Sequence, residues 1–174
     1  MLGFSFEVAA SDVDETPEEG MPAEDIPRAL AIRKALAVSP LRPEALVLAS
    51  DTLVELDGEV LGKPRDEAEA VSMLKRLNGR VHRVFTGVAL ARGGALLGAA
   101  TGRSEVEFAL RTEAELVEYV RGGEPMDKAG SYAIQGRGAF LVEKIDGCFF
   151  NVMGLPVQRT LELLTPHRAP HRAG

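Results

Sequence analysis

Residues 81–108 decide the fold of this chain, and they read VHRVFTGVALARGGALLGAATGRSEVEF. The sequence predicts two long strands, 81–91 and 95–108, joined by a tight turn at Gly93-Gly94. In the second strand Ser104 and Val106 alternate with charged residues, which is typical of a half-buried strand. A β-sheet is therefore the centre of the expected fold.

The segments on either side predict further strands and helices without strict alternation. Shorter strands are predicted at 45–49, at 53–56 with a return at 59–61 across Asp57-Gly58, and in a hairpin of 139–145 and 148–152. Helices are predicted at 25–38, at 66–77, from 112 to a stop at 122–123, and at 156–164. This mixture predicts an α/β fold with a mixed sheet flanked by helices.

The ends of the chain are less regular. Residues 4–8 alternate apolar and polar side chains and predict a strand, and an acidic loop follows at 11–25. A length of 174 residues suits one domain, or two lobes around one core. We expect a single domain over 1–164 and a disordered tail over 165–174.

Composition excludes some classes of function. The formal charge is −6, so the chain lacks the basic surface that nucleic-acid binding requires. No apolar stretch has the length of a membrane span, and the first residues do not resemble a signal peptide. The single cysteine excludes an intramolecular disulfide and fits the reducing cytoplasm.

Asp51 and two lysines are the first candidates for chemistry. Asp51 follows a buried strand, and open α/β sheets bind ligands at the carboxyl ends of their strands; a polar residue that simply ends the strand is the alternative. Lys34 and Lys63 are candidates for neutralising a phosphate, although a solvated surface lysine explains either one alone. Neither lysine lies in a Walker-type loop.

A second set of candidates could hold a metal or recognise a base. Asp12, Asp14 and Glu15 crowd one loop, and clustered carboxylates suit Mg²⁺ together with substrate phosphates. A solvated acidic loop is the alternative interpretation. Gln135, in a glycine-rich loop, has an amide that suits a base edge, or is a surface glutamine.

Taken in order, these residues resemble the Maf family of nucleoside triphosphate pyrophosphatases. The matching stretches are SDVDET (11–16), ASDT (49–52), GEVLGKPRD (58–66), GEPMDKAGSYAIQG (123–136) and NVMGLP (151–156). The resemblance implies an elongated sheet with a central cleft, and hydrolysis of a nucleoside triphosphate to the monophosphate and pyrophosphate. The DKAG and IQG pattern resembles the branch that acts on dTTP and UTP.

The resemblance also implies roles for single residues. Asp51 matches the proton acceptor or metal-linked base, and Glu15 matches an acidic residue of the metal site. Lys34 and Lys63 match phosphate-contacting lysines, and the positions of Thr52 and Gln135 are tied to base selection. A divalent cation, Mg²⁺ or Mn²⁺, and a homodimer are implied as well.

One family motif has no counterpart here. Members of the family begin with a buried strand and a Ser-x-Ser-Pro-Arg-Arg loop, followed by a helix that leads into the equivalent of Leu2-Gly3, and this sequence has no counterpart of that segment. A start codon placed too far downstream, or a truncated protein, would explain the difference. The alternative function is therefore a non-catalytic nucleotide- or partner-binding protein that affects cell division. A purine-directed pyrophosphatase fits the loop around Gln135 less well.

Overall fold

The computed structural model describes residues 5–167. The α-helices are α1 (Ile26–Val38), α2 (Glu67–Leu77), α3 (Glu113–Arg121), α4 (Phe149–Val152) and α5 (Val157–Leu164). The strands are β1 (Val47–Leu56), β2 (Glu59–Leu61), β3 (Val81–Arg92), β4 (Ala95–Phe108) and β5 (Val142–Gly147). Short 3-10 helices lie between or after them: η1 (Ser39–Leu41), η2 (Glu124–Asp127), η3 (Ala129–Ser131), η4 (Gly136–Leu141) and η5 (Thr165–His167).

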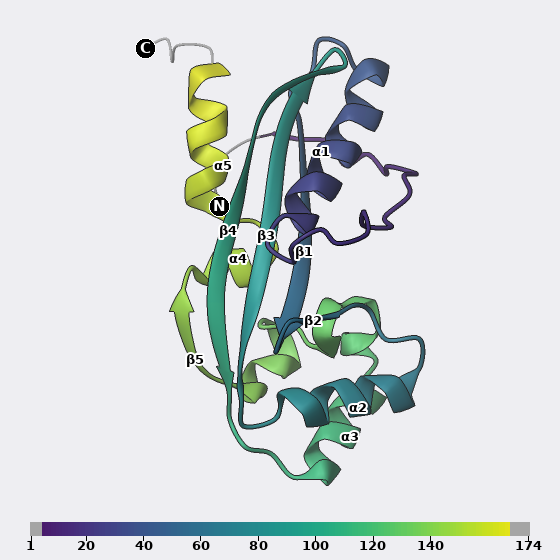
Figure 1. Cartoon of the computed structure of the whole chain (residues 1–174), viewed down its shortest axis with the longest axis vertical. Helices are drawn as coiled ribbons and strands as arrows, with labels where there is room; N and C mark the ends of the chain where they lie inside the picture. Colours follow the sequence, from purple (N-terminus) through teal and green to yellow (C-terminus); the bar gives the residue numbers. More distant parts are fainter. Residues whose placement is uncertain (1–4, 168–174) are drawn as a thin grey trace.

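The strands form one sheet in the order β2-β1-β3-β4-β5, elongated along β3 and β4 (Figure 1). The predicted turns at Asp57-Gly58 and Gly93-Gly94 join β1 to β2 and β3 to β4. The expected α/β fold with an elongated sheet and flanking helices is confirmed. Within residues 5–167, however, every strand pair is antiparallel, because the tight turns reverse the chain and β3 returns beside β1 in the opposite direction.

Helices cover both faces of the upper half of the sheet (Figure 1). Small residues of α1 pack against β3, where Ala31 and Ala35 meet Ala89 and Ala91. The approach is so close that a Cβ on Gly87 would lie 2.3 Å from the carbonyl oxygen of Pro27. On the opposite face, α4 and α5 pack against β3 and β4. The sheet is therefore the middle layer of three.

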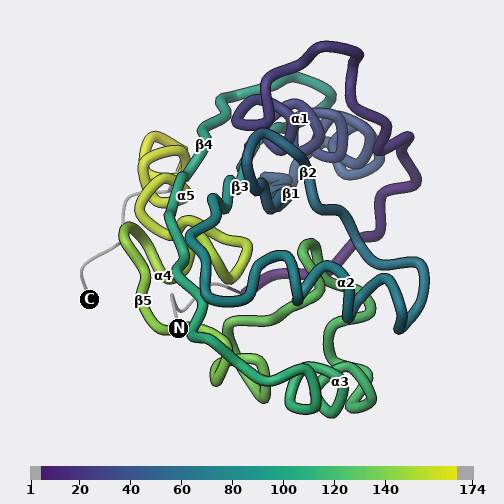
Figure 2. The backbone as a smooth tube through the Cα atoms, turned by 60° about the horizontal axis from the view of Figure 1, so that its bottom comes forward, coloured from purple at the N-terminus to yellow at the C-terminus, as the bar shows by residue number. Residues whose placement is uncertain are grey.

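The lower part of the molecule has its own apolar core, where α2 and α3 lie side by side (Figure 2). Leu74 and Leu77 of α2 and Leu116 of α3 are almost fully buried there. Both helices begin as predicted: the Asp66 side chain accepts a hydrogen bond from the Glu69 amide, and a Thr112 capping box opens α3. Local chemistry therefore fixes where these helices start.

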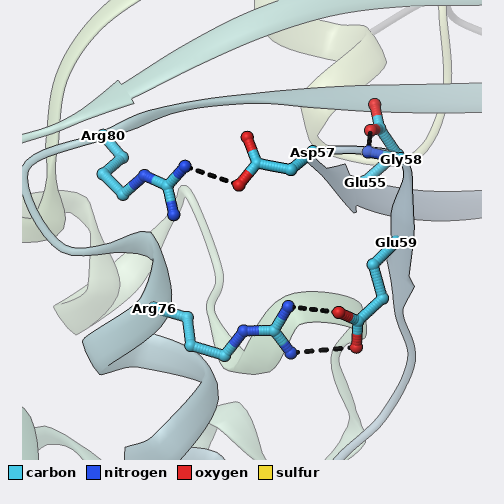
Figure 3. A network of polar contacts seen from close by, with 6 residues as sticks. All are labelled: Glu55, Asp57, Gly58, Glu59, Arg76 and Arg80. Carbon is cyan, nitrogen blue, oxygen red and sulfur yellow. Dashed lines mark hydrogen bonds and ion pairs between the residues drawn. The ribbon is translucent and has the colours of Figure 1, made fainter.

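Ion pairs tie the β1–β2 hairpin to the end of α2 (Figure 3). Arg76 binds both carboxylate oxygens of Glu59, at 3.0 and 2.6 Å, and Arg80 binds Asp57 at 2.6 Å. Glu55 accepts a hydrogen bond from the Gly58 amide inside the turn. These contacts hold β2 in place, and β2 leads directly into the loop that carries Lys63.

The predicted hairpin of 139–145 and 148–152 is wrong. Its first half begins later, as β5, which pairs with β4, and its second half is the short helix α4. Asn151 explains the helix, because its Nδ2 donates to Val84 O at 3.0 Å and to Ser104 Oγ at 3.1 Å. These bonds hold α4 against the sheet instead of beside β5.

Two predictions at the ends of the chain also change. Residues 5–8 form no strand; Phe6 and Val8 are strongly exposed, because no neighbouring strand pairs with them, and Phe4 lies outside the described residues. At the other end Thr165–His167 form the 3-10 helix η5 instead of disordered chain. Residues 168–174 of the predicted tail lie outside the described residues.

Candidate active site

Three charged side chains from three separate segments meet beside β1. The Lys34 ammonium of α1 lies 2.6 Å from Asp51 Oδ1 of β1 and 2.8 Å from Glu15 Oε1 of the N-terminal loop. Lys34 and Asp51 are only 17% and 15% exposed, whereas Glu15 is 52% exposed. The structure therefore brings together a partly buried ion pair and a second, more accessible carboxylate.

Arg33 explains how a long loop delivers Glu15 to this place. Its Nη1 donates to the carbonyl oxygens of Asp14, at 2.5 Å, and Thr16, at 3.1 Å, so it holds the residues on both sides of Glu15. Arg33 precedes Lys34 on α1, so one helix positions both partners of the ion pair. In the sequence, the only sign of this role is that the two basic residues are adjacent.

Burial and ion pairing shift the titration of these groups. Burial raises the pKa of Asp51 above its ordinary value, although Lys34 opposes the shift. The hydrogen bond from Lys34 lowers the pKa of Glu15. Burial lowers the pKa of Lys34, but its bonds to Asp51 and Glu15 outweigh that effect and raise the pKa overall. Lys34 therefore stays charged, while Asp51 is the carboxylate that accepts a proton more readily.

A cleft of about 360 Å³ opens beside this ion pair. The residues that line it are Ser50, Asp51, Thr52, Val54, Lys63, Val84, Asp127, Lys128, Ala129, Tyr132, Val152, Met153 and Gly154. Lys63 and Thr52, for which the resemblance implied contacts to phosphate and base, both line it. Gln135 is exposed and is not among the lining residues. Lys128, which forms an ion pair with Asp127 at 2.5 Å, adds a cation that was not predicted as a site residue.

Asp51 does not end a strand, and this prediction was wrong. It lies in the middle of β1, opposite Gly87 of β3, because β1 runs unbroken to Leu56. Asp51 reaches the cleft nevertheless, since β2 pairs only with residues 54–56 of β1. In the part of the chain that the structure describes, the preceding residues of β1 have a strand on one side only. The open edge of β1 therefore forms a wall of the cleft.

Strand geometry gives the cleft two chemically different sides. Successive side chains of a strand point to opposite faces, so Asp51 lies on the face of α1 and Thr52 on the face of α4. Lys34 accompanies Asp51, whereas the lining beside Thr52 is largely apolar and includes Val84 and Tyr132. One side thus suits anionic groups, and the other suits a flat ring.

The carboxylates fit a divalent cation that a substrate helps to hold. Asp51 and Glu15 already share one cation, the Lys34 ammonium. Residues 5–167 contain no group of three or more His, Cys, Asp or Glu side chains arranged to hold a metal. Mg²⁺ commonly binds one or two carboxylates and completes its shell with water and substrate phosphates. The two carboxylates therefore suit such a metal only in combination with a phosphate ligand.

Known proteins resemble this chain over most of its length. The chain is 51% identical over 170 residues to the dTTP/UTP pyrophosphatase of Symbiobacterium thermophilum, covering 97% of this chain and 87% of that protein. It is 49% identical to the dTTP/UTP pyrophosphatase of Myxococcus xanthus, covering 94% and 82%. No helix within residues 5–167 has both the length and the apolar character to cross a bilayer. The family model described as Maf-like protein matches residues 1–167, and the chain therefore belongs to this family.

Proposed function

We propose that this protein is a nucleoside triphosphate pyrophosphatase that hydrolyses dTTP and UTP to the monophosphate and pyrophosphate. The observation that carries the proposal is the partly buried Asp51–Lys34 pair at the open edge of β1, with Glu15 and Lys63 beside it. The names of the related pyrophosphatases support the same substrate class.

The side chains present suit hydrolysis between the α and β phosphates. Lys34 and Lys63 offset the negative charge of the triphosphate, which is the main requirement of phosphoryl transfer. Asp51 orients a water molecule and accepts its proton as the water attacks phosphorus and pyrophosphate leaves. Its raised pKa makes it a better base than an exposed aspartate. A divalent cation held by Asp51 and Glu15, when bound, would offset further charge and polarise the phosphate oxygens.

The alternative of a non-catalytic binding protein fits the site less well. Binding a triphosphate needs cations, but it does not need a half-buried carboxylate of raised pKa beside them. Partial burial of Asp51 costs free energy, and a catalytic base explains why the protein would keep a carboxylate there. Relatives that are 42–51% identical and named dTTP/UTP pyrophosphatase also favour the enzyme.

Pyrophosphate release from dTTP, UTP and ATP, with Mg²⁺ or Mn²⁺, tests the proposal. We expect turnover of dTTP and UTP to exceed that of ATP. Asp51→Asn should lower kcat by at least about 100-fold, the usual contribution of a general base, while KM changes by only a few fold. Asp146→Asn makes the same chemical change at an exposed position of β5, away from the cleft, and should retain activity. Near-normal turnover of Asp51→Asn would overturn the assignment of the base.

The family resemblance also leads us to propose a homodimer. Light scattering coupled to size-exclusion chromatography tests it, because a dimer has twice the 18.6 kDa mass of the chain. A mass equal to that of one chain across the concentrations used for the activity assay would overturn this proposal.

A further inference from the structure

A hydrogen-bonded relay connects the floor of the cleft to the backbone of α4. The hydroxyl of Thr86, which is fully buried on β3, lies 2.8 Å from the carbonyl oxygen of Asn151 and 3.0 Å from the hydroxyl of Thr52. Thr52 and Thr86 are directly opposite in the β1–β3 register. Thr52 lines the cleft, so the relay runs from a buried carbonyl to a surface that a ligand can reach.

The direction of each bond in this relay follows from counting protons. A carbonyl oxygen carries no proton, so the short contact between Thr86 and Asn151 requires that Thr86 donate its only hydroxyl proton to Asn151 O. The contact between the two hydroxyls then requires the proton of Thr52. Thr52 has no second proton, and it can therefore present only lone pairs to the cleft.

The buried end of the relay is held firmly. Asn151 is fully buried, and its Nδ2 donates to Val84 O and Ser104 Oγ, so its backbone cannot turn without breaking these bonds. Asn151 O also accepts from the Gly154 amide at 3.0 Å. The acceptor that sets the direction of the relay is thus fixed by the sheet and by the turn after α4.

Space beside Thr52 is kept open by a glycine. Gly154 lines the same part of the cleft. Its φ is +100°, a backbone conformation that residues with a side chain rarely adopt. A Cβ at this position would lie 3.3 Å from Thr52 Oγ1. The acceptor face of Thr52 is therefore accessible to a flat group that enters the cleft.

We propose that Thr86, oriented by Asn151 O, is a positioning residue that makes Thr52 an obligate acceptor and thereby selects a pyrimidine with an N3–H. Uracil and thymine carry this proton, whereas N3 of cytosine has a lone pair that repels an acceptor. This inference rests on the proposed function, since it identifies how the site distinguishes UTP and dTTP from CTP. Thr86 itself does not touch the nucleotide.

The test compares Thr86→Val with Thr86→Ser. Valine has the shape of threonine without the hydroxyl, so Thr52 would be free to turn its proton into the cleft and to bond N3 of cytosine. We expect the ratio of kcat/KM for UTP over CTP to fall roughly 10-fold in Thr86→Val and to stay within about two-fold of wild type in Thr86→Ser. A purely structural role would lower kcat/KM for UTP and for CTP equally and leave their ratio unchanged, and that result would overturn the proposal.

Calorimetric binding of UMP and CMP separates this proposal from the proposed function. If the wild-type protein hydrolyses UTP but Thr86→Val keeps the wild-type ratio of kcat/KM for UTP over CTP, the proposed role of the relay is wrong and the enzymatic function stands. If the protein hydrolyses neither substrate yet binds UMP more tightly than CMP, and Thr86→Val removes that preference, the relay is supported and the function fails. Equal binding of UMP and CMP by the wild-type protein overturns the relay in either case.

Discussion

Acidification should destabilise this protein through one buried histidine. His82 of β3 is 2% exposed, and its Nε2 lies 2.8 Å from the Tyr132 hydroxyl. The rings of Phe108 and Tyr132 meet it edge to face, and its Nδ1 has no hydrogen-bond partner within residues 5–167. Burial lowers the pKa of His82 from 6.5 to about 4, because an imidazolium would lose its hydration there.

The sign and size of the effect follow from proton linkage. The unfolded chain binds a proton at His82 near pH 6.5, whereas the folded protein does not until about pH 4. Between these values the unfolded state holds more protons, so the free energy of unfolding falls as the pH falls. The slope approaches about 1.4 kcal/mol per pH unit, and the loss by pH 4 is roughly 3 kcal/mol. Above pH 6.5 the contribution is complete.

Urea denaturation followed by circular dichroism between pH 7 and pH 4.5 measures this slope. His82→Gln keeps a polar side chain but cannot titrate. Its free energy of unfolding should therefore fall less on acidification than that of the wild type, by up to about 1.4 kcal/mol per pH unit. Other groups titrate in both proteins, and their contribution to the slope cancels when the two proteins are compared. His167→Gln, in the terminal helix η5, leaves His82 intact and should keep the wild-type slope. Identical slopes for His82→Gln and wild type would refute the argument.

Two further predictions concern the placement of the charged site. Arg33→Gln should release the loop that carries Glu15 and raise the metal concentration at half-maximal activity roughly 10-fold with little change in kcat, as a metal titration would detect; an unchanged titration would contradict the role of Arg33. Gly87→Ala should push α1 from the sheet, because its Cβ would lie 2.3 Å from Pro27 O, and both the thermal midpoint and activity should fall. A fully active, equally stable Gly87→Ala protein would show that this close approach is dispensable.

The predictions from sequence succeeded where neighbouring residues decide the structure. The Thr112 capping box and the Gly93-Gly94 turn depend on atoms a few residues apart, and both form as predicted. The prediction of a strand at 148–152 failed because the conformation of this segment depends on contacts of Asn151 with Val84 and Ser104, more than 40 residues away in the chain. Its apolar sequence suits a strand equally well, so local pattern alone could not decide between them.

The candidate site divides in the same way. The family resemblance singled out Asp51, Lys34 and Glu15, and the structure places them in contact. It gave no sign of the role of Arg33. That role depends on where the irregular loop of residues 11–25 passes α1. Contacts of this kind depend on tertiary packing, and no spacing in the sequence encodes them.

The register of β1 against β3 links the two sides of the cleft. Asp51 is opposite Gly87, and the absence of a side chain there lets α1 approach and bring its lysine to the carboxylate. Thr52 is opposite Thr86, whose hydroxyl sets the direction of its hydrogen bond. Two adjacent residues of β3 thus position two adjacent residues of β1, one in the charged cluster and one for the base selection that we propose. Because a slip of one residue would exchange the two faces, both properties depend on the same pairing of strands.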